Sequence, residues 1–297
     1  MFPKVPDHHK PDKPMVPNGL GVIYVLTSST YLFMLHFSKI VESNAPSGVS
    51  PALTLAVCIL FGGFLGLLDD WLDLRWRYKA FLPILASLPL AALREGTPIM
   101  ATYFWGKIDF TQYGWVGETF FYFAMIPLIV TITTNTVNQL GGLNGLETLC
   151  PSVVLIGFLA GAQPELRTLL YVPIVAYLIL GFCNFQGRIF VGNTGSFAIG
   201  ITMASYALIA NIEQTLVISI LPYIINSSLI LFSFFLLKER AHLSTSHDQK
   251  LVSDHRRSLV TLISYKRPTS ERGIVIVISL LMIVSTISAL LVQFVSL

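Results

Sequence analysis

Long apolar segments follow one another along almost the whole of this 297-residue chain and restrict its fold more than any other feature. A helix needs about 20 apolar residues to cross a lipid bilayer. Nine ranges are candidates: 20–38, 51–68, 80–94, 118–135, 150–163, 168–184, 195–211, 214–237 and 273–296. The sequence therefore predicts an all-α polytopic membrane protein with about nine transmembrane helices, of which the third and fifth are short.

The charge content also separates this chain from soluble proteins. Only 12% of its residues are charged, whereas an average soluble domain carries about 25%. The net charge of +3 does not indicate nucleic acid, so the expected partner is the lipid bilayer. No long linker divides the chain, and residues 1–297 are expected to form a single membrane-embedded domain. The three cysteines lack metal-ligand spacing and are expected to be buried and unpaired.

Basic residues are distributed unevenly over the connections between the apolar ranges. Lysine and arginine are enriched in cytosolic loops. If residues 1–18 are cytosolic, then 69–79, 136–149, 185–194 and 238–272 are cytosolic too, and 15 of the 19 basic residues lie on that side. All segments with unusual polar chemistry then share this face, so the sequence predicts a cytosolic active site. Residues 1–10 are expected to be a disordered tail, with a fixed lid strand as the alternative.

Charge is concentrated in "LLDDWLDLRWRYK", directly after the second apolar range. A continuing helix would bring Asp69, Asp70 and Asp73 to one edge where it leaves the membrane. Carboxylates this close repel one another, and a cation or a protonated member would relieve the repulsion. The alternative is a solvated helix end, neutralised by the two arginines and the lysine that follow.

Amides and glycines are concentrated in "NTVNQLGGLNGLE", residues 135–147. Asn135 and Asn138 project from one helical face, and glycines such as Gly142 let a ligand approach the backbone. Amide oxygens can bind polar groups or a hard cation. The alternative is ordinary turn chemistry between two spans.

Two further segments carry groups suited to phosphate. In "NFQGRIFVGNTGSFAIG", Asn193 or Thr194 is expected to cap the start of a helix, and helix N-termini attract phosphate. Simple capping is the alternative. The 238–272 loop holds eight basic residues and three histidines, which could bind phosphate or anchor the loop to anionic lipid. Asn226, inside an apolar range, is interpreted as a packing group.

The order of these motifs resembles the polyprenyl-phosphate N-acetylhexosamine-1-phosphate transferases. The resemblance runs from "KPMVPNGLG" to the final apolar range, and its most specific parts are "GLLDDWLDLRWRYKAFLP", "NTVNQLGGLNGLE" and "NFQGRIFVGNTGSFAIG". Within this family the chain is most similar to the dolichyl-phosphate GlcNAc-1-phosphate transferases.

This resemblance implies an enzyme that transfers GlcNAc-1-phosphate from UDP-GlcNAc to dolichyl or polyprenyl phosphate. The products would be lipid-diphosphate-GlcNAc and UMP, in the first step of lipid-linked oligosaccharide assembly for N-glycosylation. It implies Mg²⁺ as cofactor, with Mn²⁺ as an alternative. The expected location is the endoplasmic reticulum membrane in a eukaryote, or the plasma membrane in a prokaryote. A homodimer is one of the expected assembly states.

The resemblance also implies roles for individual residues. The implied catalytic residues are Asp69, Asp70 and Lys79, and the implied metal ligands are Asn138 and Asn193. The implied substrate-binding residues are Asn18, Trp76, Asn135, Gly142, Asn144, Arg240 and His242.

The chain departs from the family pattern at two points. The family's Gly-Asp-Thr is Gly192-Asn193-Thr194 here. Asparagine keeps one oxygen but loses the charge, so lower metal affinity and a lower rate are expected. A catalytically impaired or non-catalytic relative is therefore an alternative, as is a transferase that uses another UDP-HexNAc. Family members usually carry one more span before the Lys-Pro segment, and this sequence begins without it.

Overall fold

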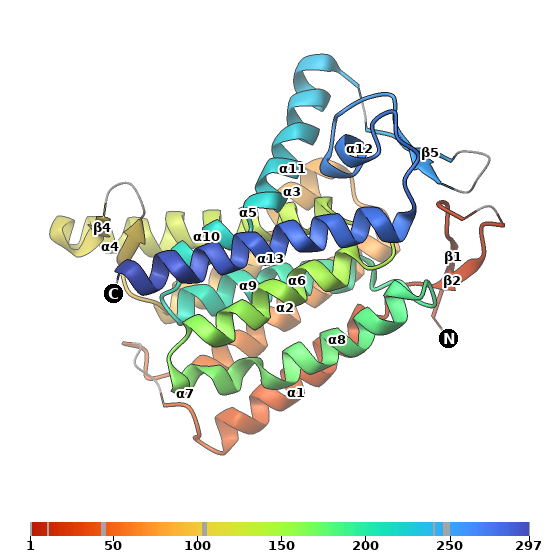
Figure 1. Ribbon diagram of the computed structural model, residues 1–297. Coiled ribbons are helices and arrows are strands. Elements are labelled where there is room, and N and C mark those ends of the chain that lie inside the picture. The colour runs from red at the N-terminus through yellow and green to blue at the C-terminus, as the bar shows by residue number, and fades with distance from the viewer. Residues whose placement is uncertain are drawn as a thin grey trace.

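A computed structural model describes residues 2–10, 12–42, 46–102, 106–239, 241–245 and 250–296, which are mostly helical. Figure 1 shows long helices side by side, with small hairpins at both ends of the bundle. The helices are α1 (Gly21–Phe37), α2 (Pro51–Leu72), α3 (Trp76–Leu93), α4 (Gly114–Phe120), α5 (Ile126–Gln139), α6 (Leu146–Gly161), α7 (Pro164–Arg167), α8 (Tyr171–Phe185), α9 (Gly192–Ile209), α10 (Glu213–Ser219), α11 (Leu221–Phe232), α12 (Leu259–Ile263) and α13 (Glu271–Ser296).

Short 3₁₀ or π segments lie at Phe110–Tyr113, Phe121–Met125, Thr168–Leu170 and Ser233–Leu237, and three antiparallel hairpins accompany the helices. They pair β1 (Lys4–Pro6) with β2 (Met15–Pro17), β3 (Ile99–Thr102) with β4 (Gly106–Asp109), and β5 (Ser244–Thr245) with β6 (Leu251–Val252). The β1–β2 hairpin, β5 and α12 lie at one end of the bundle in Figure 1, and the β3–β4 hairpin and the C-terminus lie at the other. The expectation of a disordered tail is wrong for residues 2–10, because β1 and the turn after it are held against the rest of the protein.

The helical prediction is confirmed, but the count of nine spans is not. Each of the nine predicted ranges overlaps a helix or a run of helices. In the described part of the chain, four helical segments are long and apolar enough to cross a membrane: Pro51–Leu72, Phe110–Gln139, Pro164–Phe185 and Glu271–Val295. The pair α10 and α11 makes a fifth if its 58° bend is counted within one span, and α1 and α6 are apolar but shorter.

Helix α9 lies at the centre of the packing. Every residue from Thr194 to Ile209 is buried, and the helix contains no charged residue. A helix that is apolar on all sides must be surrounded by other elements. Here α2 and α5 provide the largest contacts and α1 adds a third.

Gly66 on α2 allows a close approach to the first turn of α9. A Cβ at this position would lie 2.6 Å from the Cα of Thr194 and would overlap the carbonyl group of Asn193. The Cβ-free surface therefore brings the backbones together one helical turn before Asp70. This contact is what places the acidic segment beside the start of α9.

Asn226 is confirmed as a packing group with two backbone partners. Its Nδ2 donates to the carbonyl oxygen of Gln139 (3.3 Å), and its Oδ1 accepts from the N–H of Leu259 (2.9 Å). It therefore ties α11 to the end of α5 and to the start of α12. The cysteines are unpaired as expected, with Cys58 and Cys150 buried and Cys183 half-buried.

Replacing Gly66 with alanine is expected to destabilise the protein by about 1–3 kcal/mol, because the added methyl group overlaps a backbone that cannot move away freely. The loss can be measured from the melting temperature of the detergent-purified protein. Gly181→Ala is the matched control, since the nearest atom to its added Cβ is a side-chain carbon at 3.3 Å. Equal stability of both variants would contradict the close α2–α9 contact.

Candidate active site

The carboxylate of Asp70 binds the first turn of α9. Its Oδ1 accepts from the N–H of Asn193 (2.9 Å), and its Oδ2 accepts from the N–H (2.9 Å) and the hydroxyl (2.7 Å) of Thr194. The expected capping by Asn193 or Thr194 is wrong, because α9 begins at Gly192 and its N-cap position is Val191. An anion from α2 takes the place of a local cap, where it satisfies unpaired N–H groups and faces the positive end of the helix dipole.

Asp69 has a different environment from its neighbour. Its side chain is buried, and its Oδ1 accepts from the Lys79 ammonium (2.9 Å) and the N–H of Leu74 (3.1 Å). Its Oδ2 has no hydrogen-bond partner among the described residues. The Asp69–Lys79 pair thus links α2 to the first turn of α3.

The predicted edge of three carboxylates is wrong, because α2 ends at Leu72. Asp73 follows in the left-handed backbone region with φ 44°. Its side chain is fully exposed, and its nearest cation, Lys79, lies 3.8 Å away. The alternative of a solvated helix end therefore holds for Asp73, whereas the side chains of Asp69 and Asp70 bind groups inside the protein.

Asn138 is joined to α9 through Ser196. The hydroxyl of Ser196 donates to Asn138 Oδ1 (2.6 Å) and also lies 3.4 Å from the carbonyl oxygen of Asn193. Both residues that the family resemblance implies as metal ligands are therefore linked to one serine. Asn135, one turn earlier on α5, donates instead to the carbonyl oxygen of Ala80 on α3 (2.9 Å).

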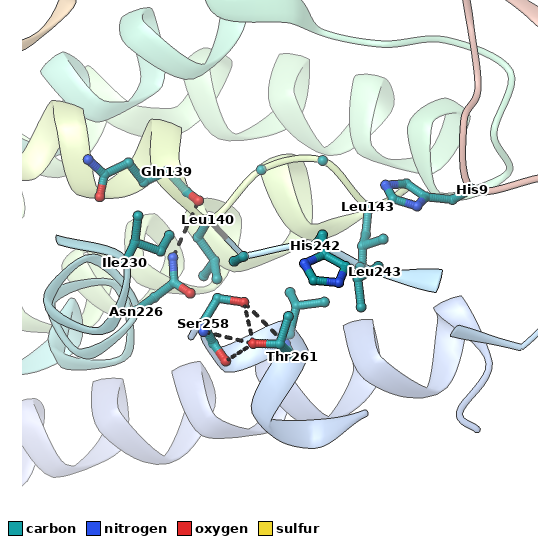
Figure 2. A pocket seen from close by; sticks show the side chains of 14 residues that line it. His9, Gln139, Leu140, Leu143, Asn226, Ile230, His242, Leu243, Ser258 and Thr261 are labelled. Atoms are coloured by element: carbon teal, nitrogen blue, oxygen red, sulfur yellow. Dashed lines mark hydrogen bonds between the residues drawn. The ribbon is translucent and has the colours of Figure 1, made fainter. Parts of the chain in front are cut away.

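Several cavities border these residues, including one of about 370 Å³ that is lined by Asn18 and Asp70. Three others are the hairpin cavity, the groove and the loop cavity. The hairpin cavity, of about 350 Å³, lies between the turn after β1 and the start of α9. The groove, of about 470 Å³, runs between α3, α5 and α11. The loop cavity, of about 330 Å³, lies between the end of α5, the 241–243 segment and α12. Figure 2 shows His9 and His242 at one end of the loop cavity, with Asn226 at the other.

The sequence-predicted residues divide among these cavities. Asp70, Asn193, Asn18 and Gly142 line the hairpin cavity, Lys79, Trp76, Asn135 and Asn138 line the groove, and Gly142 and His242 line the loop cavity. Asn144 is buried and lines none of the three. Arg240 falls outside the described residues.

Sequence reasoning did not predict the contacts of four polar residues at the site. Thr194 and Ser196 lie in the motif that begins α9, but nothing local identifies their partners on α2 and α5. Glu147 lines the hairpin cavity, and its carboxylate accepts from the N–H of Gly142 (3.1 Å). Asp7, in the assumed tail, is buried and lines the same cavity. Its position among prolines and lysines gave no signal of burial.

Another polar cluster borders the loop cavity through His242. Within the described ranges, His242, Asp254 and His255 form the group of potential metal ligands whose atoms lie within 4.8 Å of one another. Burial and the neighbouring His242 lower the pKa of His255, which therefore favours its neutral form. Imidazole ligands suit transition metals rather than Mg²⁺.

Replacing Lys79 with methionine is expected to lower the stability by about 1–3 kcal/mol, because Asp69 would lose its charged partner inside the protein. Thermal unfolding in detergent measures the loss. Asp73→Asn is the matched control, since this exposed carboxylate lies 3.8 Å from the same lysine and its loss should change little. A wild-type melting temperature for Lys79→Met would show that the pair does not stabilise the fold.

Comparison with known proteins agrees with this arrangement of motifs. The chain is 29% identical over 230 residues to a protein of Saccharolobus solfataricus named putative UDP-N-acetylglucosamine–dolichyl-phosphate N-acetylglucosaminephosphotransferase, covering 74% of this chain and 66% of the relative. A Dictyostelium discoideum protein of the corresponding name is 29% identical over 247 residues, covering 71% and 59%. A phospho-N-acetylmuramoyl-pentapeptide-transferase of Bacillus pumilus is 24% identical over 235 residues, covering 71% and 65%.

The chain thus spans less than two thirds of the length of these relatives. Residues 52–211, which include the acidic pair, the amide segment and the start of α9, match the family described as Glycosyl transferase family 4. The match covers more than half of the chain, and the protein belongs to this family.

Proposed function

We propose that this protein transfers GlcNAc-1-phosphate from UDP-GlcNAc to dolichyl phosphate or a similar polyprenyl phosphate. The observation that carries the proposal is the convergence of three distant motifs on the first turn of α9, through Asp70 with Thr194 and Asn138 with Ser196. The names of the archaeal and Dictyostelium relatives support the substrate pair.

In the proposed reaction, an oxygen of the lipid phosphate attacks the β-phosphorus of UDP-GlcNAc. A new P–O bond forms, the bond from the β-phosphorus to the bridging oxygen breaks, and UMP leaves with the electron pair. A phosphate monoester with a second pKa near 6 is already mostly ionised at neutral pH, so the attack needs little help from a base. Positioning and charge neutralisation remain the main requirements.

The protein residues fit these two requirements. Both oxygens of Asp70 accept hydrogen bonds from α9, so this carboxylate holds the start of the helix in position. Lys79 lines the groove and is only partly engaged by Asp69, since its side chain keeps 27% of its exposure. Its ammonium group can therefore also meet the phosphate of a lipid.

The oxygen groups around the start of α9 fit Mg²⁺. We assign Asn138, Asn193 and Asp70 as the residues that would hold it, with the unpartnered Oδ2 of Asp69, the residue next to Asp70, as a further buried oxygen. Mg²⁺ prefers oxygen ligands and commonly binds through few protein groups together with substrate phosphates. When bound, the ion would neutralise charge on the transferred phosphate. Because the family's aspartate is replaced by Asn193, this set of ligands carries one negative charge fewer. Mn²⁺ is an alternative ion for the same site.

The groove suits the lipid substrate. Trp76, Ile132, Ile224 and Leu231 give it apolar walls, and Lys79 adds a positive charge. A polyprenyl chain can therefore lie on the apolar side chains while its phosphate meets the lysine. The hairpin cavity, lined by polar groups and backbone, suits the nucleotide diphosphate.

We also propose that the face carrying these cavities is cytosolic and that the chain forms one membrane-embedded domain. The uneven distribution of lysine and arginine supports this orientation. The corresponding membrane is the endoplasmic reticulum in a eukaryote, or the plasma membrane in a prokaryote.

The wild-type protein is expected to release UMP from UDP-GlcNAc only with polyprenyl phosphate and Mg²⁺. Asn193→Asp should increase the rate at limiting Mg²⁺ by about 10-fold, because one added carboxylate charge near the ion is worth on the order of 1.4 kcal/mol. Release of UMP by the detergent-purified wild type, Asn193→Asp and Asn193→Ala proteins measures this effect.

The outcomes separate the alternatives. Activity only with Asn193→Asp would identify a catalytically impaired chain. UDP-GlcNAc binding without activity in any variant would identify a non-catalytic relative, and preference for another UDP-HexNAc would change the donor sugar. Absence of all binding would overturn the proposed function.

Blocking the groove tests the assignment of the lipid site. Ser228→Trp on α11 is expected to raise the KM for polyprenyl phosphate by about 10-fold, because the ring would fill space that the lipid needs. Affinity for UDP should stay unchanged. Ile225→Trp is the control, since this exposed position on the same helix does not line the groove. A KM for the lipid that is equal in both variants would exclude the groove.

A further inference from the structure

Asn144 is surrounded by two carboxylates. Its Nδ2 donates to Asp7 Oδ2 (2.9 Å) and to Glu271 Oε1 (2.9 Å), and its backbone N–H donates to the same Glu271 oxygen (2.8 Å). The residue is only 4% exposed. Both amide hydrogens are therefore taken by protein acceptors, one from the N-terminal segment and one from the first turn of α13.

Asp7 lies in the β1–β2 hairpin, between its two strands. Its carboxylate is 2% exposed, pairs with Lys10 (3.0 Å) and receives the Asn144 amide. Its backbone N–H donates to the carbonyl oxygen of Pro14 (3.0 Å), which closes the hairpin. The next two residues, His8 and His9, line the hairpin cavity. The Asp7–Asn144 contact therefore holds the segment that forms one wall of this cavity.

The 142–145 segment is itself held from two sides. Asn184 Oδ1 accepts from the N–H of Gly145 (2.8 Å), and Glu271 accepts from the N–H of Asn144. This support makes Asn144 a rigid anchor, whereas the β1–β2 hairpin has two three-residue strands and little core of its own. A two-stranded hairpin of this size is not stable by itself in water.

We infer that Asn144 is a positioning residue: with Glu271 it latches the β1–β2 hairpin through Asp7, and the latched hairpin forms the wall that binds a nucleoside diphosphate. This inference rests on the proposed function for the nature of the ligand. It differs from direct recognition, in which the Asn144 side chain would itself contact the nucleotide. In the structure Asn144 does not line the hairpin cavity, and its Nδ2 donates to Asp7 and Glu271.

The chemistry of Asp7 favours a stable latch. A buried carboxylate is costly unless it is paired and hydrogen-bonded. Burial raises the pKa of Asp7, but hydrogen bonds from Asn144 and Lys10 outweigh this effect, so the pKa lies below its usual value. Asp7 is therefore ionised at neutral pH, and removal of the Asn144 amide would leave its charge with fewer partners and favour undocking of the hairpin.

A double-mutant cycle on UDP affinity tests the latch. Asp7→Ala and Asn144→Ala, in the full-length protein in detergent, should each weaken UDP binding by about 10-fold in titration calorimetry. Because both changes undo one latch, the double variant should also bind about 10-fold more weakly than wild type. Independent direct contacts would instead multiply to about 100-fold, and that result, or full affinity in Asp7→Ala, would overturn the inference.

Hydrogen exchange gives a second readout that does not depend on the ligand. Backbone amides of residues 2–10 and 12–17 should exchange about 10-fold faster in both single variants, while those of α9 stay unchanged. Asp12→Asn, an exposed acid in the same hairpin, is the control and should match wild type. Unchanged exchange in Asp7→Ala would overturn the latch. Absence of UDP binding in the wild type would instead overturn the proposed function. The exchange result would still show whether Asp7 and Asn144 hold the hairpin in place.

Discussion

The hydrogen bonds from the start of α9 to Asp70 are the interaction on which the rest of the structure depends. Helix α9 is buried from Thr194 onward and Asn193 is half-buried, so the N–H groups of its first turn need acceptors from the protein. The N-cap position is Val191, which offers no side-chain acceptor. The carboxylate must come from α2, and it can do so because Gly66 lets the two backbones approach. The close packing of α2 on α9 and the hydrogen bonds from α9 to Asp70 therefore depend on each other.

The three acidic residues at the end of α2 therefore have different partners. Asp70 accepts hydrogen bonds from α9, Asp69 pairs with Lys79, and Asp73 faces solvent. Two inward carboxylates against one ammonium leave a local excess of negative charge, which would repel a diphosphate and a lipid phosphate. A divalent cation reverses this balance. Under the proposed function, asparagine at position 193 would reduce the repulsion of phosphates but would also bind a cation more weakly than aspartate, so its effect on rate would depend on the cation concentration.

Local sequence predicted the helices well because apolar length is a direct requirement of a helix in a membrane. It also predicted that the third range, at α3, and the fifth, at α6, are short, and neither helix is among the segments long and apolar enough to cross a membrane. It did not predict the bend between α10 and α11 at Ile220. At the site, the motifs were located but their partners were not. The partner of Thr194 lies 124 residues away and that of Asn144 lies 137 residues away, distances over which no local pattern carries information.

The hairpin cavity and the loop cavity share His9 and Gly142. One elongated ligand with a base, a diphosphate and a sugar could therefore extend across both, with the turn after β1 beside it. The groove also borders α5, where Gln139 lines both the groove and the loop cavity and Asn138 contacts Ser196 at the start of α9. Nucleotide and lipid would thus meet at the first turn of α9, and the position of the β1–β2 hairpin would set how firmly the nucleotide is held there.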